Sequence, residues 1–422
     1  MPVGIRGCLL AAAAALLVSS SGAAAAAKLD TLYSFCSQSG CPDGDQPYGG
    51  VTLLAPGRMI GTTGFGGKYN GGTVFALDDK HGTAKLRTLA NICAGTPPSC
   101  ASDEGPSTTL VEDTSGNIYG TVYFGGSSSD GAVFELEAKG KQKYKLHYLY
   151  SFNGTDGYGP QNLTYAGQAS GAPYDGTSPL YGAAIAGGTE SSGIVFSLTP
   201  KNGKWTLATL YNFCSADNCS DGGLPEAAPI VDPSGNLYGT TEYYGANNAG
   251  TIYELANTNG SWNYSLLYTF CSAANCSDGN GSYAGLAEDA GGNLYGTTYF
   301  GGTENDGVAF ELATGDSTYT VLHDFCSQAN CTDGSEPFAA VTLDASGNIF
   351  GTTSRGGDGN FGTLFEIAKG AFKRLYSFCA LSGCADGGYP YGTLALDAKG
   401  RIYGTTQYGG ANDLGEVYEL KP

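Results

Sequence analysis

Cysteine pairs are the residues of this chain whose types and spacing most directly imply chemistry. After Cys8 the sequence holds twelve further cysteines, which fall into six closely spaced pairs. Zinc needs four ligands brought together, whereas these pairs are spread along a chain with only three histidines. Because the chain also begins with an export signal (below), the pairs predict six local disulfides and no metal site. They are Cys36–Cys41, Cys93–Cys100, Cys214–Cys219, Cys271–Cys276, Cys326–Cys331 and Cys379–Cys384.

An Asp-Gly dipeptide follows five of the six pairs. Its carboxylate, together with turn carbonyls, would suit calcium. The alternative is an Asx turn that closes the loop. We expect the turn and no cofactor, since one carboxylate per loop offers too few ligands, and calcium is kept as the alternative. The residues concerned are Asp43, Asp221, Asp278, Asp333 and Asp386.

Side chains suited to acid–base catalysis are few. The three histidines, His81, His147 and His323, are expected in outer strands or on the face away from the disulfide loops, so catalysis based on histidine is not predicted. Carboxylates remain, but their spacing singles out none, and the catalytic residues stay unknown. The candidate carboxylates are Asp45, Glu226, Glu242, Glu304, Glu336 and Asp358.

The elements that must position these residues recur along the chain. Near copies of one stretch include GNLYGTTYFGG from residue 292, GNIYGTVYFGG from 116 and GNIFGTTSRGG from 347. Each copy holds four strand-like runs bounded by Gly, Asn, Asp or Ser; around Gly239 they span 228–232, 236–241, 250–255 and 264–270. Four strands per repeat predict a propeller blade. The glycine of the shared YGT element lies at Gly61, Gly120, Gly182, Gly239, Gly296, Gly351 and Gly404.

The two ends of the chain complete one another. The sequence after the export signal starts with LDTLYSF, a fourth-strand pattern, and ends with GEVYELKP, a third-strand pattern. Residues 31–35 are therefore expected to pair with residues 415–420 and to complete the seventh blade, which removes free sheet edges. The sequence predicts an all-β, seven-bladed propeller with four antiparallel strands per blade, a single domain over residues 28–422, and a monomer.

GNLYGTT, followed by a Gly-Gly turn and then GTVF or GTIY, resembles the repeat of the GloVer tandem-repeat proteins. The resemblance covers about residues 29–420 and implies an exported bacterial protein of unknown activity. It supplies no catalytic residues. Members of that family usually end in a C-terminal sorting anchor; none is seen before Pro422, so surface attachment is not predicted.

The third copy departs from the others. Six copies have 14 residues from the residue that opens the first strand to the YGT glycine, whereas the third has 22 from Pro160 to Gly182. The extra residues lie within AGQASGAPYDGTSP, and the same copy lacks the cysteine pair. Because this insertion joins the first and second strands, it is expected on the face opposite the disulfide loops, where it serves either nothing or a separate protein contact.

The disulfide loops and the Gly-Gly turns are expected on one common face. An aromatic residue precedes the glycine pair in five of seven copies, which we interpret as packing between blades rather than as a sugar platform. Two departures mark possible specialisation: Arg355 replaces the aromatic, and Tyr244 replaces a glycine. The alternative is that Arg355 pairs with an acidic neighbour such as Asp358 and that Tyr244 fills a gap between blades. The candidate binding residues are Tyr69, Tyr123, Tyr243, Tyr244, Tyr299, Arg355 and Tyr408.

The composition and the predicted signal peptide limit the possible functions. Residues 1–27 have one Arg, an apolar run and an Ala-rich end, a pattern that predicts a signal peptide and a periplasmic or extracellular protein. No later stretch is long and apolar enough to predict a membrane span. Acidic residues outnumber basic ones 39 to 20, which excludes nucleic acid as a partner.

These features favour a binding or interaction module whose ligand is a glycan or an envelope or extracellular protein. One alternative is a glycan-cleaving hydrolase or lyase, which would gather two carboxylates about 5–9.5 Å apart at the central mouth of the propeller. Another is a purely structural surface protein. The sequence does not identify the ligand.

Overall fold

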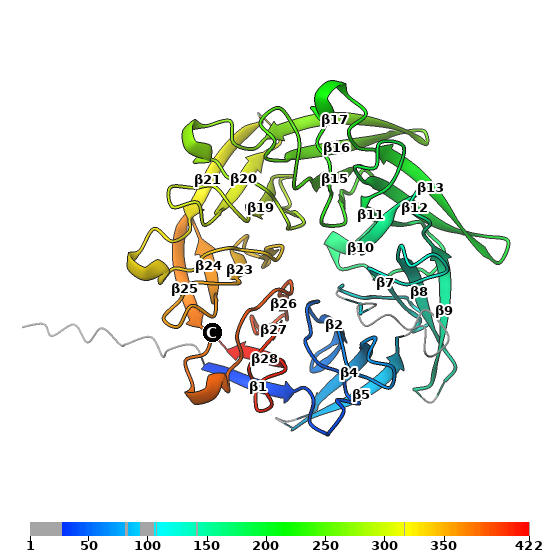
Figure 1. The fold of residues 1–422 in the computed structure, drawn as a ribbon, viewed down its shortest axis with the longest axis vertical. Coiled ribbons are helices and arrows are strands. Elements are labelled where there is room, and N and C mark those ends of the chain that lie inside the picture. The colour runs from blue at the N-terminus through cyan, green and yellow to red at the C-terminus, as the bar shows by residue number, and fades with distance from the viewer. Residues whose placement is uncertain are drawn as a thin grey trace, which may run out of the picture.

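A computed structural model of the chain describes residues 28–80, 83–92, 105–106, 108–140, 142–315 and 317–421. The predicted signal peptide (1–27), the Cys93–Cys100 pair and His81 lie outside these residues. Within the described part, seven four-stranded antiparallel sheets surround a central axis, as Figure 1 shows. The predicted seven-bladed propeller is confirmed. No helix of the described residues has the length and apolar character needed to cross a membrane.

In blades 1 to 6, the four strands follow one another from the axis outward in chain order (Figure 1). Blade 1 holds β2 (Thr52–Ala55), β3 (Arg58–Thr63), β4 (Thr73–Lys80) and β5 (Thr83–Asn91). Blade 2 holds β6 (Val111–Glu112), β7 (Ile118–Val122), β8 (Ala132–Ala138) and β9 (Tyr144–Ser151). Blade 3 holds β10 (Tyr158–Tyr165), β11 (Leu180–Ala186), β12 (Ile194–Lys201) and β13 (Lys204–Asn212).

The remaining blades repeat this pattern. Blade 4 holds β14 (Ile230–Val231), β15 (Leu237–Thr240), β16 (Thr251–Thr258) and β17 (Ser261–Thr269). Blade 5 holds β18 (Ala287–Glu288), β19 (Leu294–Thr298), β20 (Val308–Ala313) and β21 (Thr318–Asp324). Blade 6 holds β22 (Thr342–Leu343), β23 (Ile349–Thr353), β24 (Thr363–Ala368) and β25 (Ala371–Ser377).

Blade 7 closes the ring. It combines β26 (Ala395–Leu396), β27 (Ile402–Thr406) and β28 (Glu416–Lys421) with β1 (Lys28–Ser34) from the other end of the chain. Strand β1 runs antiparallel to β28, in a register that pairs Lys28 with Lys421 and Ser34 with Glu416. Phe35, directly after β1, is fully buried, which contributes about 1.5–3 kcal/mol to the closure.

The glycine of the YGT element packs against a ring from the next strand. A Cβ atom on Gly61 would lie 2.6 Å from Phe75 Cζ, and one on Gly351 would lie 2.4 Å from Phe365 Cζ. These separations are too short for two carbon atoms, so only glycine fits. The recurrence of the element is therefore explained by packing, and it belongs to the scaffold.

The described disulfide loops share one construction. Five of the six predicted disulfides are present, with Cα–Cα separations of 3.9–4.1 Å. The carbonyl of the second cysteine accepts a hydrogen bond from the Gly-Gly turn of the same face, for example from Gly245 N to Cys219 O at 3.0 Å. Four of the five loops contain a 3-10 turn: η2 (Asp217–Cys219), η3 (Ala274–Cys276), η4 (Ala329–Cys331) and η5 (Ser382–Cys384).

The Asp that follows each pair closes its loop. In blade 4, the carboxylate of Asp278 accepts hydrogen bonds from the backbone N–H groups of Ser272 (2.8 Å) and Ala273 (3.1 Å). It also accepts one from the hydroxyl of Tyr268 at 2.7 Å. Asp221 and Asp386 make the same set of bonds in their own loops. Both oxygens of these carboxylates are therefore engaged in holding the loop.

The insertion in blade 3 packs against blade 2. It contains η1 (Gln168–Ser170) and leads to Tyr174, which is buried and forms an isolated bridge with Asp113. The ring of Tyr174 meets that of Tyr119 edge to face, with centroids 5.5 Å apart. The insertion joins β10 to β11 as expected. It also fills a contact between blades 2 and 3, so it has a structural role, and the expected contact with a separate protein stays a prediction.

Candidate functional site

The first strands of the blades enclose a central cavity of about 720 Å³. Small residues form the middle of its wall, because the strands converge on the axis. They are Gly49, Gly50, Ala227, Ala228, Ala284, Gly285, Ala339, Ala340, Gly392 and Thr393. The end on the side of the disulfide loops, here called the channel mouth, carries larger side chains. At the other end the insertion contributes Gly171, Ala172 and Pro173 to the wall.

An arc of four aromatic side chains covers one side of the channel mouth. Tyr283, Phe338, Tyr391 and Tyr48 follow one another across blades 5, 6, 7 and 1, and all line the cavity. Their successive ring centroids are 5.3, 5.2 and 6.1 Å apart. Each occupies the position directly after the residue that opens the first strand. We call this group the aromatic arc.

A pair of carboxyl groups lies between the aromatic arc and blade 2. Glu226 directly follows Pro225, the residue that opens the first strand of blade 4, and lines the cavity; Glu242 follows β15 of the same blade. The hydroxyl of Tyr283 donates a hydrogen bond to Glu242 Oε1 at 2.7 Å. Burial and the neighbouring Glu242, which is within hydrogen-bonding distance, raise the pKa of Glu226 to about 8. The pair therefore retains one proton at neutral pH.

Amide and phenol groups complete the polar side of the mouth. Gln161 and Asn162 of β10 line the cavity, and so does Tyr123 of blade 2. Burial raises the pKa of Tyr123 to about 12, with a further contribution from Glu226 and Glu242. The phenol of Tyr123 therefore stays protonated and able to donate a hydrogen bond.

Arg355 belongs to a second group at the rim of the mouth. Its Nε lies 2.9 Å from Glu336 Oε2, and the same oxygen accepts a hydrogen bond from the hydroxyl of Tyr299 at 2.6 Å. The guanidinium lies 5.7 Å from the ring centroid of Tyr389. The alternative that Arg355 pairs with an acidic neighbour is confirmed, but the partner is Glu336 rather than Asp358, which Arg374 of β25 holds at 2.8 Å.

The structure separates the predicted binding residues into three places. Tyr123 lines the cavity, while Tyr299 and Arg355 meet at Glu336 beside it. Neither Tyr69 nor Tyr244 is part of the cavity lining. Tyr69 lies under Lys68, whose Nζ is 5.0 Å from its ring centroid, and the ring of Tyr244 packs over Gly223.

Aromatic residues before the glycine pair lie outside the cavity on the same face. Tyr243, Phe300 and Tyr408 are 48%, 37% and 38% exposed. Packing between blades was expected; these three side chains are only partly covered, and Tyr408 contacts the ring of Tyr389 with centroids 5.7 Å apart. Each sits on a short backbone bridge between the Gly-Gly turn and the disulfide loop, for example Tyr243 with Gly223, which directs the side chain to the surface.

The described histidines lie in the outer strands, as expected. His147 of β9 bonds Glu137 at 3.0 Å. His323 of β21 bonds Asp333 at 3.1 Å and stacks on Phe372 with ring centroids 3.6 Å apart. Burial lowers the pKa of His323, although Asp333 acts in the opposite direction. Neither histidine lines the central cavity.

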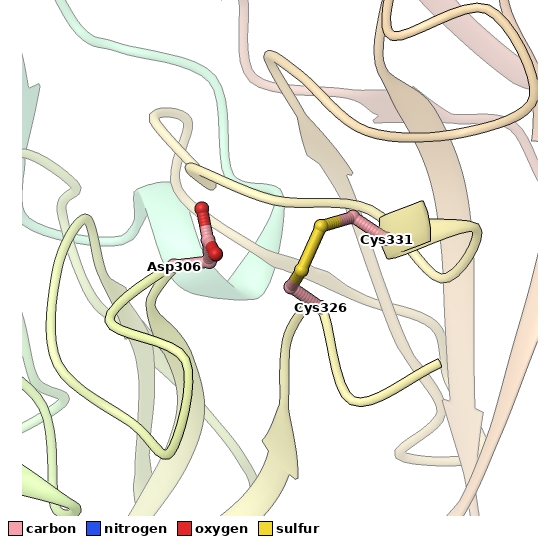
Figure 2. A group of neighbouring side chains, drawn as sticks. All are labelled: Asp306, Cys326 and Cys331. Atoms are coloured by element: carbon pink, nitrogen blue, oxygen red, sulfur yellow. A yellow bond between two sulfur atoms is a disulfide. The ribbon is translucent and has the colours of Figure 1, made fainter. Parts of the chain in front are cut away.

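One group of metal-type ligands occurs among the described residues. Asp306, Cys326 and Cys331 place a ligand atom each within 4.8 Å of one another, and Figure 2 shows the carboxylate beside the two sulfurs. The sulfurs are joined in a disulfide. A metal would require thiolates, so this group does not form a metal site.

Sequence comparison places the chain among known families. The Gloeobacter/Verrucomicrobia repeat matches residues 21–179, 164–330 and 326–422. The chain belongs to the Gloeobacter/Verrucomicrobia repeat family. This confirms the resemblance noted from the repeated motif. Comparison with curated proteins gives no significant match.

Solved structures with a similar fold have diverse functions. A Bacteroides uniformis protein provisionally assigned as a 6-phosphogluconolactonase is 14% identical, with a TM-score of 0.47 over 78% of this chain and 83% of that one. TolB from Acinetobacter baumannii is 12% identical, with a TM-score of 0.42 over 88% and 78%. A Trypanosoma rangeli sialidase is 12% identical, with a TM-score of 0.42 over 81% and 55%. Likenesses this distant carry no information on the ligand.

The aromatic arc was missed by the sequence analysis, although the signal was present. Aligning the copies at the first strand places Tyr48, Tyr283, Phe338 and Tyr391 at one position, with Glu226 at the same position of blade 4. Small residues follow this position and form the middle of the cavity wall. The large residue before them was not recognised as the rim of the channel.

Proposed function

We propose that this protein is an exported binding module that holds a glycan at the channel mouth of the propeller. The observation that carries the proposal is the aromatic arc facing the Glu226–Glu242 pair across one cavity. Aromatic faces pack against the apolar faces of sugar rings, while carboxyl, amide and phenol groups exchange hydrogen bonds with hydroxyls. The rim group of Arg355, Glu336 and Tyr299 adds polar groups beside the aromatic arc, in blades 5 and 6.

The glycan-cleaving alternative receives less support from this geometry. Carboxyl pairs of glycosidases are separated by about 5 Å or more, so that a sugar ring or a water fits between them. Glu226 and Glu242 lie close enough for Glu242 to raise the pKa of Glu226. A protein ligand remains the second alternative, because exposed Tyr243, Phe300 and Tyr408 surround the mouth on the same face.

A glycan array probed with the mature protein tests the proposal. We expect binding to oligosaccharides, and we expect Phe338→Ala and Tyr391→Ala each to reduce the affinity at least tenfold, because each removes a ring from the cavity wall. Tyr69→Ala provides the matched control, since Tyr69 does not line the cavity. Loss of binding in Tyr69→Ala but not in Tyr391→Ala would place the site on the outer rim and refute the proposal.

A further inference from the structure

The carboxyl pair at the channel mouth has no compensating cation among the residues that the structure describes. Among the described residues that line the cavity, Glu226 and Glu112 are acidic, and none is Lys, Arg or His. Arg355 is a basic residue at the rim, but its Nε already pairs with Glu336 Oε2 at 2.9 Å. Glu112, at the other end, has Arg58 within 3.7 Å. Glu226 and Glu242 form no ion pair with any described residue.

The side of the mouth across from this pair is rich in aromatic rings. The aromatic arc lines four adjacent blades, and aromatic faces attract cations because their quadrupole places negative charge on the face. Both walls of the mouth therefore favour positive charge. An anionic sugar would be repelled by the carboxyl pair, and a neutral sugar would gain hydrogen bonds but leave the negative charge uncompensated.

We propose that the channel mouth selects glycans that carry a free ammonium group, the deacetylated amino sugars, over neutral and anionic glycans. This inference rests on the proposed function and names its ligand class. The ammonium group lies between the aromatic arc and the Glu226–Glu242 pair, where it donates hydrogen bonds to the carboxylates and approaches the ring faces.

Binding of the cation is coupled to loss of a proton. Without ligand, burial and mutual repulsion keep one proton on the pair. An ammonium group beside the carboxyls favours their charged forms, so the shared proton leaves to solvent as the cation enters. The pair changes from one negative charge to two, and the bound ammonium group brings one positive charge.

Isothermal titration calorimetry with two trisaccharides tests the inference. The probes are the trimer of glucosamine and the fully N-acetylated trimer, titrated near pH 6, where the free amine is a cation. We expect the glucosamine trimer to bind the mature protein about tenfold more tightly. Repeating the titration in buffers of different ionisation enthalpy should show proton release with the glucosamine trimer and none with the acetylated trimer.

Two variants separate the role of the pair from general charge. Glu226→Gln should bring the ratio of the two dissociation constants close to one and abolish proton release. Glu190→Gln, an exposed residue in the Gly-Gly turn of blade 3, makes the same charge change and should leave the ratio as in the wild type. Thermal denaturation of both variants checks that they fold.

The outcomes distinguish the inference from the proposed function. Equal affinities, or tighter binding of the acetylated trimer, would overturn the selection for an ammonium group and leave glycan binding intact. A preference that survives in Glu226→Gln would overturn the assignment to the carboxyl pair. If no oligosaccharide bound at all, neutral or cationic, the proposed function itself would be wrong.

Discussion

Glu416 makes the stability of the propeller depend on pH through the strand that closes the ring. It is fully buried at the start of β28, where it pairs with Ser34 of β1 and Thr406 of β27. Neither carboxyl oxygen makes a hydrogen bond of normal geometry. Burial raises the pKa of Glu416 to about 8, and the nearby Thr31 hydroxyl offsets only part of this. Blades 1, 4 and 6 have Thr at this position.

The sign and size of the effect follow from proton linkage. In the unfolded chain Glu416 titrates near its ordinary pKa, about 4.3, so above that pH the unfolded state loses a proton that the folded state keeps. The contribution of Glu416 to folding stability is therefore fully present below about pH 4 and is lost as pH rises toward 8. At about 1.4 kcal/mol per pH unit, about 4 kcal/mol of stability is lost from Glu416 between pH 5 and pH 8.

Urea denaturation between pH 5 and pH 8 measures this dependence. We expect Glu416→Thr, which introduces the residue found in blades 1, 4 and 6, to remove it and to be more stable than the wild type at pH 8 by several kcal/mol. Glu190→Gln, which is exposed, should keep the pH dependence of the wild type. A wild type and a Glu416→Thr variant with parallel pH profiles would refute the argument, because Glu416 would then be ionised in the fold.

Three further outcomes are expected. Burial lowers the pKa of His323, so the contribution of this residue to stability is lost as pH falls below about 6.5. His323→Tyr should therefore reduce the loss of Tm between pH 7 and pH 5. Equal losses in the variant and the wild type would contradict this. Replacing Cys271 and Cys276 with Ser should cost about 2 kcal/mol in urea denaturation, and an unchanged midpoint would show that the loop is fixed without its disulfide. Deleting residues 28–34 should abolish the single cooperative melting transition, because β28 loses its outer partner β1. Retention of that transition would mean that the ring does not depend on closure by β1.

The fold was predictable from the sequence because the same strand pattern recurs in every copy of the repeat. Seven copies with a constant spacing between the second and third strands leave one arrangement of four strands per unit, and the split terminal repeat fixes the closure. The disulfides followed from proximity along the chain. Each of these predictions depends on contacts within a blade or between neighbouring blades, which the repeat itself specifies.

The candidate site was only partly predictable, because it depends on contacts across the axis. Arg355 and Tyr244 stood out as departures from the repeat, yet Arg355 is neutralised by Glu336 and Tyr244 packs over Gly223, next to the disulfide loop. Which first-strand residue points into the channel depends on how the seven first strands converge. The sequence of a single copy does not determine this arrangement. The contact of Glu226 with Glu242 likewise requires knowing that the start of one strand and the end of another meet at the mouth.

One position in the repeat determines the asymmetry of the channel mouth. Tyr48, Tyr283, Phe338 and Tyr391 occupy it in four blades that are adjacent across the closure of the ring, whereas Glu226 occupies it in blade 4. Because every blade presents this position at the same end of its first strand, side-chain identity alone decides which sector is apolar. Although the ring of blades is nearly symmetric, this asymmetry of the mouth would favour one orientation of a ligand bound there. Its specificity can change by substitution at this position without disturbing the packing of ring against glycine that holds the blades.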